Sequence, residues 1–567
     1  MPPQPAHAFD CLLDTNNDGN ADTNIDTDAA ADSGGIDSRL ACGTNASATD
    51  TNATAVGNGA EALAENTVAV GILSDATAID AVAIGNSSEA TFAAAVAVGR
   101  TSNALAVNAV AIGNTSDVQA GATNGIAIGI NSDVEANAEN AIAIGALSDA
   151  TATDAVALGN TAEAEANAAI AIGRSSDAFA ANSVAVGNLS RATASSAVAL
   201  GPFSNSFGQN SVAVGISSRA TADNAVSLGP NSLASATQSI AIGILSQATT
   251  GNAAMAIGAS SRATAANAVA LGPTAMATAV NAVAVGESAE ASGENAIAIG
   301  EDAEAGTTAA DRGAIAIGND GDGDLDGAQA LAAGAVAIGE DAQATNTMAV
   351  ALGQGAVASG STAVGGGAMA TGVNSTAFGM NAIASGANSS AIGENTVASG
   401  ANTVALGESA QATFANSVAI GKGVQTTRAN QVLIGNAANT YTAPGIASAA
   451  SRAAQSGAVQ VVTTDAAGNL AAADTTQLAA LIDPVLDSRI QENAEGVAMA
   501  MAVSGAFVLP SGKNFGFSAN WGNFEGSNAL GFGATGRVRP NVFLSGGFGF
   551  GLDEGTTGGR AGVLIAF

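Results

Sequence analysis

The chain has 567 residues and a formal net charge of -33, with 47% hydrophobic but only 3% aromatic residues and a single histidine, His7. The acidic balance argues against nucleic acid and against a polybasic membrane surface as partners. One histidine nearly excludes a histidine-based triad or a histidine-ligated zinc site, and no nucleophile–base pair or phosphate loop occurs, so we expect no enzyme.

The N-terminus carries a feature of exported proteins. Residues 1–8 contain Ala6-His7-Ala8, which is typical of the cleavage site that ends a secretory signal peptide; in an alanine-rich chain it is equally a chance match. Residues 9–50 form an acidic segment that contains both cysteines, Cys11 and Cys42. In an exported protein these two would most simply pair with each other.

The acidic segment also holds half of a calcium-binding motif. Asp14, Asn16, Asp18 and Asp22 follow the D-x-N-x-D-G pattern, in which oxygen ligands at alternate positions suit a hard cation. Ile25 stands where the motif has a bidentate glutamate, so calcium binding and an ordinary acidic loop are both open interpretations.

A 14-residue repeat organises the next part of the chain. From Gly57 to Gly435, 27 glycines recur mostly 14 residues apart, each closing a stretch such as Asn281-Ala-Val-Ala-Val-Gly286. Alternation with period two predicts a short strand, and a second strand follows each glycine. Two strands and two turns per repeat predict one coil of a narrow parallel β-solenoid. Residues 51–436 should therefore form about 27 coils, a rod of roughly 130 Å.

Each predicted coil has two distinctive outward positions. The Ala-Val-Ala-Ile strand is apolar on both faces, so one face needs a partner, and self-association along the rod is the simplest solution. The residue four after the glycine is mostly acidic in early coils, whereas later coils place Arg191, Arg219 and Arg262 there. We expect this column to be exposed, because stacked charges resist burial.

One insertion in the repeats contains a second partial calcium-binding motif. A polar loop at 319–327 lies in a 21-residue interval before Gly339, and Asp322, Asp324 and Asp326 form a second half-motif without the glutamate.

A connector and a short helix follow the rod. Residues 437–474 contain a predicted hairpin between Val459 and Leu470, and Asp483-Pro484 reads as a helix start. Within 475–502, apolar residues recur at intervals of 4, 3, 4 and 3, which predicts a short coiled-coil seam with one polar member. The seam residues are Leu486, Ile490, Asn493, Val497 and Ala500.

Residues 503–567 have the pattern of a membrane β-barrel. Four alternating runs are expected at 513–522, 527–536, 540–550 and 559–567. In the last run large apolar residues up to Phe567 share one face and small residues share the other, as in transmembrane strands. Four strands cannot close a barrel, so several chains must contribute.

From residue 50 onward the sequence resembles the YadA-like trimeric autotransporter adhesins. The Asn-Ala-Val-Ala-Ile-Gly repeats are similar to that family's left-handed parallel β-roll head, and Arg428-Ala-Asn-Gln-Val-Leu-Ile-Gly435 is similar to the lead-in to its neck. Helix 484–502 with the four strands resembles its membrane anchor. The resemblance implies an all-β homotrimer in which three chains form a 12-stranded barrel with three helices in its lumen. The stalk is much shorter than the family pattern.

The resemblance also implies residue roles. Ile490-x-x-Asn493 is similar to the stalk pattern whose asparagines hold an anion on the trimer axis, which gives that role to Asn493. Phe567 resembles the terminal aromatic of the barrel-insertion signal, so the barrel-assembly machinery is an expected partner. No cofactor other than calcium is expected.

The implied function is that of a cell-surface adhesin of a Gram-negative bacterium. The anchor would lie in the outer membrane, with export by a type V autotransporter route through the chain's own barrel. The head would bind a matrix protein, a glycan or a cell-surface ligand. A structural fibre for autoaggregation or biofilm is the alternative. A solenoid enzyme of the pectin-lyase kind would need coils of about 22 residues and a polar cleft, and neither is present.

Overall fold

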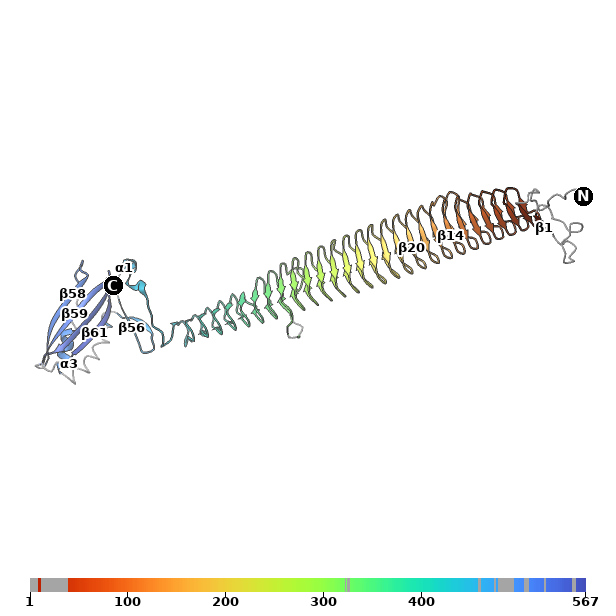
Figure 1. Ribbon diagram of the computed structural model, residues 1–567. Coiled ribbons are helices and arrows are strands. Elements are labelled where there is room, and N and C mark those ends of the chain that lie inside the picture. Colours follow the sequence, from red (N-terminus) through yellow and green to blue (C-terminus); the bar gives the residue numbers. More distant parts are fainter. Residues whose placement is uncertain are drawn as a thin grey trace, which may run out of the picture. The chain divides into compact units, whose positions relative to one another are not determined.

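The computed structural model describes most of the chain as two compact units, Met1–Ala437 and Ala438–Phe567. The described residues are 9–11, 39–321, 323, 327–456, 460–473, 476–477, 494–503, 509–524, 527–552 and 557–566. The first unit is built of short strands, and the second combines strands with short helices (Figure 1).

The first unit is a stack of two-stranded coils (Figure 1). A typical coil contains a long strand, β36 (Val283–Val285), and a short strand, β37 (Glu290–Ala291), and the next coil opens with β38 (Ile297–Ile299). Described long strands form one 29-stranded sheet that includes β1 (Phe9–Cys11) and β55 (Val432–Ile434). Short strands from β3 (Ser47–Ala48) to β53 (Gln411–Ala412) form the second sheet. The predicted parallel β-solenoid is therefore confirmed, and its left-handed sense stays a prediction.

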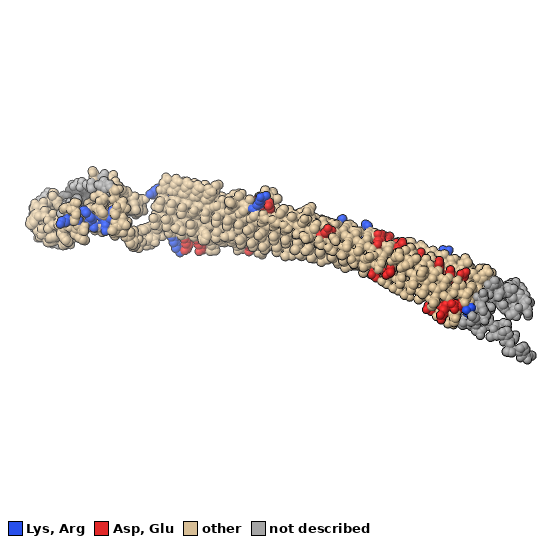
Figure 2. All heavy atoms as spheres, turned by 90° about the horizontal axis from the view of Figure 1, so that it is seen from above, with Lys and Arg blue, Asp and Glu red and all other residues tan. Residues whose placement is uncertain are grey.

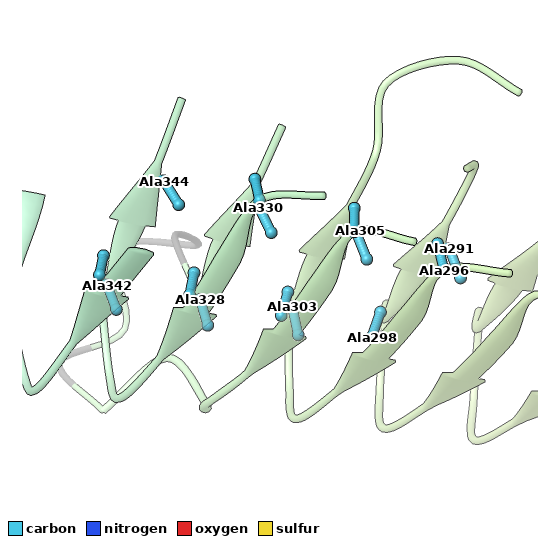
Figure 3. Close-up of a cluster of buried hydrophobic side chains, with 14 of the residues drawn as sticks. Ala291, Ala296, Ala298, Ala303, Ala305, Ala328, Ala330, Ala342 and Ala344 are labelled. Atoms are coloured by element: carbon cyan, nitrogen blue, oxygen red, sulfur yellow. The ribbon is translucent and has the colours of Figure 1, made fainter. Parts of the chain in front are cut away.

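Alanine fills the interior of the roll. Ala284 on the long strand and Ala291 on the short strand have no exposed surface, whereas Val283 and Val285 point outward and stay partly exposed. Figure 3 shows the same arrangement for neighbouring coils, with Ala298 and Ala305 among the side chains between the two sheets. A coil of 14 residues encloses too little space for larger side chains, which explains the scarcity of aromatic residues.

Polar groups inside the roll are satisfied locally. Ser88 is fully buried, and its hydroxyl donates to the carbonyl oxygen of Gly85 at 3.2 Å. The same serine-to-glycine bond recurs in many coils, for example from Ser261 to Gly258 at 2.9 Å. A buried hydroxyl is tolerated because it has this partner.

Both turns of the coil need unusual backbone angles. Gly85 has a φ of 145°, and a Cβ atom there would overlap the carbonyl oxygen of Gly99 in the next coil. This clash explains why glycine recurs once per coil. The opposite turn holds asparagine in the left-handed region, such as Asn281 at φ 57°. Its amide accepts from Asn267 and donates to Asn295, both at 3.0 Å, which forms a ladder of side chains.

Strand pairing continues through both irregular parts of the head, its first coils and its insertion. β2 (Leu40–Cys42) pairs with β4 (Thr54–Val56), so paired coils begin before residue 51. Across the insertion, β39 (Glu304–Ala305) pairs directly with β41 (Gln329–Ala330). In the other sheet β40 (Ile315–Ile317) pairs with β42 (Val336–Ile338), so both sheets continue past the insertion.

The second unit begins with small elements. These are a 3₁₀ turn, η1 (Pro444–Ala447), a short helix, α1 (Ala449–Ala454), and an antiparallel hairpin of β56 (Val461–Thr464) and β57 (Leu470–Ala473). The hairpin is the one expected from the sequence. Helix α1 is not, and its Ser448 cap accepts a hydrogen bond from the Ser451 amide.

The C-terminal part is a helix on an antiparallel sheet. Helix α3 (Ala494–Val503) precedes β58 (Phe515–Phe524), β59 (Ser527–Arg539), β60 (Val542–Gly551) and β61 (Thr557–Ile565), which pair in chain order. The four predicted strands are confirmed, with ends displaced by a few residues. None of the helices in the described part of the chain is long and apolar enough to cross a membrane.

The two faces of this sheet differ in side-chain size. Glycines lie under α3: a Cβ atom on Gly549 would come within 2.8 Å of side-chain carbons of both Met499 and Val503. Large apolar side chains stand on the other face, where Phe517 is 83% and Trp521 63% exposed. The face of the sheet with small side chains thus contacts helix α3. The face with large apolar side chains is not covered by any other described residues.

Candidate binding surface of the roll

The surface of the roll is organised as columns of equivalent residues, because each coil stacks in register on the next. On the short strands, Asp117 pairs with Asp133, Asp133 with Asp149 and Glu163 with Asp177. Neighbouring strands lie about 4.8 Å apart, so these carboxylates form a file, here called the acidic column, which one neutral residue, Asn103, interrupts. Its members are Glu61, Asp75, Glu89, Asp117, Asp133, Asp149, Glu163 and Asp177. Figure 2 shows acidic side chains gathered toward the N-terminal end of the rod.

The acidic column is less exposed than the sequence predicts. All its members except Glu61 are half-buried, because each lies between equivalent side chains above and below it, whereas Arg191, Arg219 and Arg262 are exposed as expected. Burial, and after it repulsion from neighbouring carboxylates, raises the pKa of Asp75, Asp117 and Asp149 to about 6. The expectation of an exposed column is therefore wrong for these half-buried carboxylates, and it is confirmed for Glu61 and the three arginines.

The column ends at a favourable charge pair. The Nε atom of Arg191 lies 3.2 Å from Oδ2 of Asp177, and its guanidinium stands 5.6 Å from the centre of the Phe179 ring. Beyond this pair the same positions carry mostly arginine or neutral residues, and Glu290 and Glu304 are two later carboxylates among them. The surface of the head thus changes its charge part-way along its length.

One group of carboxylates in this region has the chemistry of a cation ligand set. Oxygen atoms of Asp133, Glu135 and Asp149 lie within 4.8 Å of one another, and Gln119 donates to both oxygens of Asp133 at 3.2 Å. Glu135 follows the column residue by two positions and so shares its outward face. Three carboxylates are fewer than the six to eight oxygen ligands that calcium takes, so water would have to supply the rest.

The structure does not describe the predicted calcium motifs, Asn493 or Phe567. Asp14, Asn16, Asp18 and Asp22, and likewise Asp322, Asp324 and Asp326, lie outside the described residues. The same holds for Asn493 and Phe567, so their roles stay predictions.

The cysteines are placed by the first strands of the roll. Parallel pairing of β1 with β2 puts Cys11 directly opposite Cys42. In-register neighbours about 4.8 Å apart fall inside the range of Cα separations that a disulfide spans. Cys42 is disulfide-bonded, and we keep Cys11, the one other cysteine of the sequence, as its proposed partner.

The long strands present a second continuous surface, here called the apolar face. Outward residues at the third strand position include Leu271, Val285 and Ile299, and these stack in register from coil to coil. Leu271 and Ile299 are 43% and 38% exposed. Contiguous exposed apolar surfaces of this kind are typical of interaction sites.

The repeats match a known family over more than half of the chain. The model of the YadA head domain repeat (2 copies) matches residues 40–60, 62–88, 93–116, 150–176, 178–204, 208–232, 220–246, 250–275, 277–303, 330–356, 344–361, 356–382, 384–407 and 398–423. The chain belongs to the YadA-like trimeric autotransporter adhesins. It is accordingly an adhesin of the trimeric autotransporter type, in a family of non-enzymatic proteins, and its coils are YadA-type β-roll repeats.

Comparison with individual proteins gives a narrower result. The chain is similar to a crystal structure of the collagen-binding domain of the Yersinia adhesin YadA, with 31% sequence identity over 29% of this chain and 73% of that one and a TM-score of 0.19. No curated protein matches the sequence.

The residue directly after each closing glycine is a further surface position that was not predicted from the sequence. In the YadA-type roll this residue stands at an exposed edge, as Arg174 and Glu287 show. The signal is available in the sequence once coils are aligned by their glycines, because these residues then form a column of their own.

Proposed function

We propose that this chain is a cell-surface adhesin of a Gram-negative bacterium whose trimeric head binds host or environmental surfaces. The observation that supports this proposal is the roll itself: YadA-type repeats stack in register from Leu40 to Ile434 and build a long, narrow rod. A rod of this kind buries little and presents most side chains outward, which suits extended contact with a surface.

The proposed trimer follows from the apolar face. Valine, isoleucine and leucine occupy the outward positions of the long strands in most coils, and a single chain leaves them partly exposed. Packing three rolls with these faces toward a common axis would bury them all. The acidic column and the edge residues would then remain available to ligands.

The proposed anchor follows from the C-terminal sheet. Within the described residues, β58 and β61 each pair on one side only, so both edges can pair with neighbouring copies. Three copies would close a 12-stranded barrel with α3 against the glycine-rich inner face and the aromatic face toward lipid. Such a barrel would serve export by the type V route and be inserted by the barrel-assembly machinery.

The test is to display the full chain on a strain without adhesins of its own and to measure adhesion to matrix proteins, glycans and cultured cells. Collagen belongs in the panel because the similar Yersinia domain is described as collagen-binding. Two deletions remove whole coils and keep the register: residues 58–145 and residues 202–286. Each joins a closing glycine to a residue that normally follows one. Display is quantified in parallel with an epitope tag.

An adhesin predicts that at least one surface is bound by the parent and lost with one deletion but not the other. Adhesion that is unchanged when the head is removed would contradict the proposal. Clumping of the cells without binding to any surface of the panel would instead favour the structural fibre.

A further inference from the structure

Three of the chain's 15 basic residues meet at one end of the C-terminal sheet. Arg537 and Arg539 lie at the end of β59, and Nη2 of Arg539 donates to the hydroxyl of Ser448, the cap of helix α1, at 3.3 Å. Arg452 lies in the last turn of α1 and folds back to donate to the carbonyl oxygen of Ala447, also at 3.3 Å. We call Arg452, Arg537 and Arg539 the arginine cluster. Figure 2 shows basic side chains on the surface of this unit.

An irregularity in strand pairing brings the two arginines of β59 close together. Arg537 lies opposite Phe543 of β60, and Arg539 lies opposite Val542, so the register skips Val538. Bulges of this kind redirect side chains, and they are frequent at barrel rims and next to functional sites. The two arginines therefore face consecutive residues of β60, although they are two positions apart in their own strand.

Arg539 is a buried charge without an opposite charge beside it among the described residues. It is only 5% exposed, and its Nε atom has no hydrogen-bond partner. The Nε atom of Arg537 is likewise buried without a partner, and its guanidinium stands 5.2 Å from the centre of the neutral Phe543 ring. Arg452 adds a further positive charge, which repels that of Arg539. Buried charge in such surroundings is costly unless an opposite charge accompanies it.

The described part of the chain supplies no carboxylate to the arginine cluster. The ion pairs found among the described residues all lie in the first unit. Asp465 is the one carboxylate of the second unit whose side chain is described, and its oxygens accept hydrogen bonds inside its own hairpin, from Ala467 and Asn469. The cluster therefore offers positive charge and free N–H donors to a ligand.

The chemistry of the arginine cluster favours a phosphate group as the ligand. A guanidinium presents parallel N–H donors that match two phosphate oxygens, and clustered arginines are a common means of recognising phosphate. A phosphate group brings more acceptor oxygens than a carboxylate and up to two negative charges, so it can serve several arginines at once. Arg452 and Arg537 are only half-buried, so the cluster can be reached from the surface.

We propose that the arginine cluster binds a phosphate-bearing anion, with Nε of Arg537, Nε of Arg539 and the guanidinium of Arg452 as donors. Two sources carry this chemistry, free inorganic phosphate and the headgroup of a phospholipid. The lipid source rests on the proposed function, in which this sheet is a membrane anchor. Because the cluster lies at a strand end, it would then be at the level of the headgroups, where basic pockets bind anionic lipids.

The test uses the full chain in a non-ionic detergent, with titration calorimetry and thermal melts as readouts. The probes are inorganic phosphate, the short-chain lipid dioctanoyl phosphatidylglycerol, and dioctanoylglycerol, which has the same acyl chains without the phosphate. The variants are Arg539→Gln and Arg452→Gln. The matched control is Arg560→Gln, which removes an exposed arginine of β61 outside the cluster.

We expect the parent to bind at least one of the two phosphate probes, and which of them it binds identifies the source. Arg539→Gln should lose about tenfold in affinity, because a hydrogen bond to a charged group contributes about that factor. Arg452→Gln should weaken binding severalfold, and Arg560→Gln should bind like the parent. Without a probe, Arg539→Gln should melt no lower than the parent, because it removes a buried charge that has no partner.

Three results would each overturn the proposal: no binding of either phosphate probe by the parent, equal binding by the parent and the cluster variants, or equally tight binding of dioctanoylglycerol. If Arg539→Gln does not fold, Arg452→Gln decides. Membranes of cells that express the parent are fractionated alongside. A parent that is recovered in the outer membrane but binds no phosphate overturns the arginine site alone, whereas a parent absent from the outer membrane overturns the proposed anchor.

Discussion

Single positions of the roll have very different surroundings. On the long strand β36, Ala284 is fully buried between the two sheets and Val285 lies on the apolar face. On the short strand β33 (Arg262–Ala263), Arg262 is exposed. Ala284→Glu would place a carboxylate in a dry interior without a partner, which costs several kcal/mol per chain. Arg262→Glu should change stability by less than about 0.5 kcal/mol. Thermal melts of the full chain carrying each substitution measure the difference.

Val285→Glu tests the other face of the same strand. Its side chain is only partly buried in one chain, so a strong destabilisation requires cover from partner chains. We expect it to lower the melting temperature as clearly as Ala284→Glu does. If it melts with the parent, the apolar face is open to water and the trimeric packing is wrong.

The half-buried carboxylates make stability depend on pH. The pKa of Asp75, Asp117 and Asp149 is raised to about 6 in the folded state from a usual value of 3.8. The folded chain therefore binds protons more tightly than the unfolded chain between these values, and stability falls as pH rises from about 4 to above 6. We expect a higher melting temperature at pH 4.5 than at pH 7.5.

Amide substitutions identify the groups responsible. Asp117→Asn with Asp149→Asn removes two of the charges and should raise the melting temperature at pH 7.5, which narrows the difference between the two pH values. Glu287→Gln, an exposed carboxylate outside the acidic column, should leave that difference unchanged. A parent that is equally stable at both pH values would show that the column is fully solvated.

The N-terminal calcium motif is tested by titration calorimetry of the full chain. The alternating oxygens of Asp14, Asn16 and Asp18 predict heat on addition of calcium, and Asp14→Ala with Asp18→Ala should abolish most of it. Identical heat in parent and variant would return this segment to an ordinary acidic loop.

At the scale of single elements, the closing glycine limits the coil most strictly. In Gly85→Ala the added Cβ atom would overlap the Gly99 carbonyl, and the φ of 145° is strained for any other residue. We expect a loss of stability of at least about 1–3 kcal/mol per chain. Gly366→Ala is the matched control, since the nearest atom to its added Cβ, the Gln354 oxygen, is 3.9 Å away. Melts of both variants that coincide with the parent would contradict the stacking of the glycine turns.

The strands of the roll were predictable because two signals agree in every coil. Alternation sets the strand and glycine sets the turn, so even three-residue elements such as β36 are placed correctly from the sequence. The four C-terminal strands were predictable from the same period-two pattern. Helix α1 was not, because six residues of alanine-rich sequence carry no helical periodicity beyond their Ser448 cap.

The properties of the surface were harder to predict. The acidic column is visible in the sequence, but its burial depends on side chains one coil above and below, which are 14 residues away along the chain. The exposed edge column has the same origin: Ile216, Pro230 and Ile244 are 14 positions apart in sequence and become successive members of one column only after the coils stack.

At the scale of the whole molecule, a single chain leaves two surfaces without a partner among the described residues. A single chain leaves the apolar face of the head partly exposed and the two sheet edges at β58 and β61 paired on one side only in the described residues. Three chains would remove both problems at once, because in the proposed trimer the rolls would cover one another and the sheets would close into a barrel.

Multi-angle light scattering of the detergent-solubilised full chain, corrected for bound detergent, tests this claim most directly. We expect a protein mass of three times the 53.8 kDa of one chain, and the same species should persist in SDS without heating. A mass of one chain under these conditions would contradict the trimer, and with it the closed barrel and the buried apolar face.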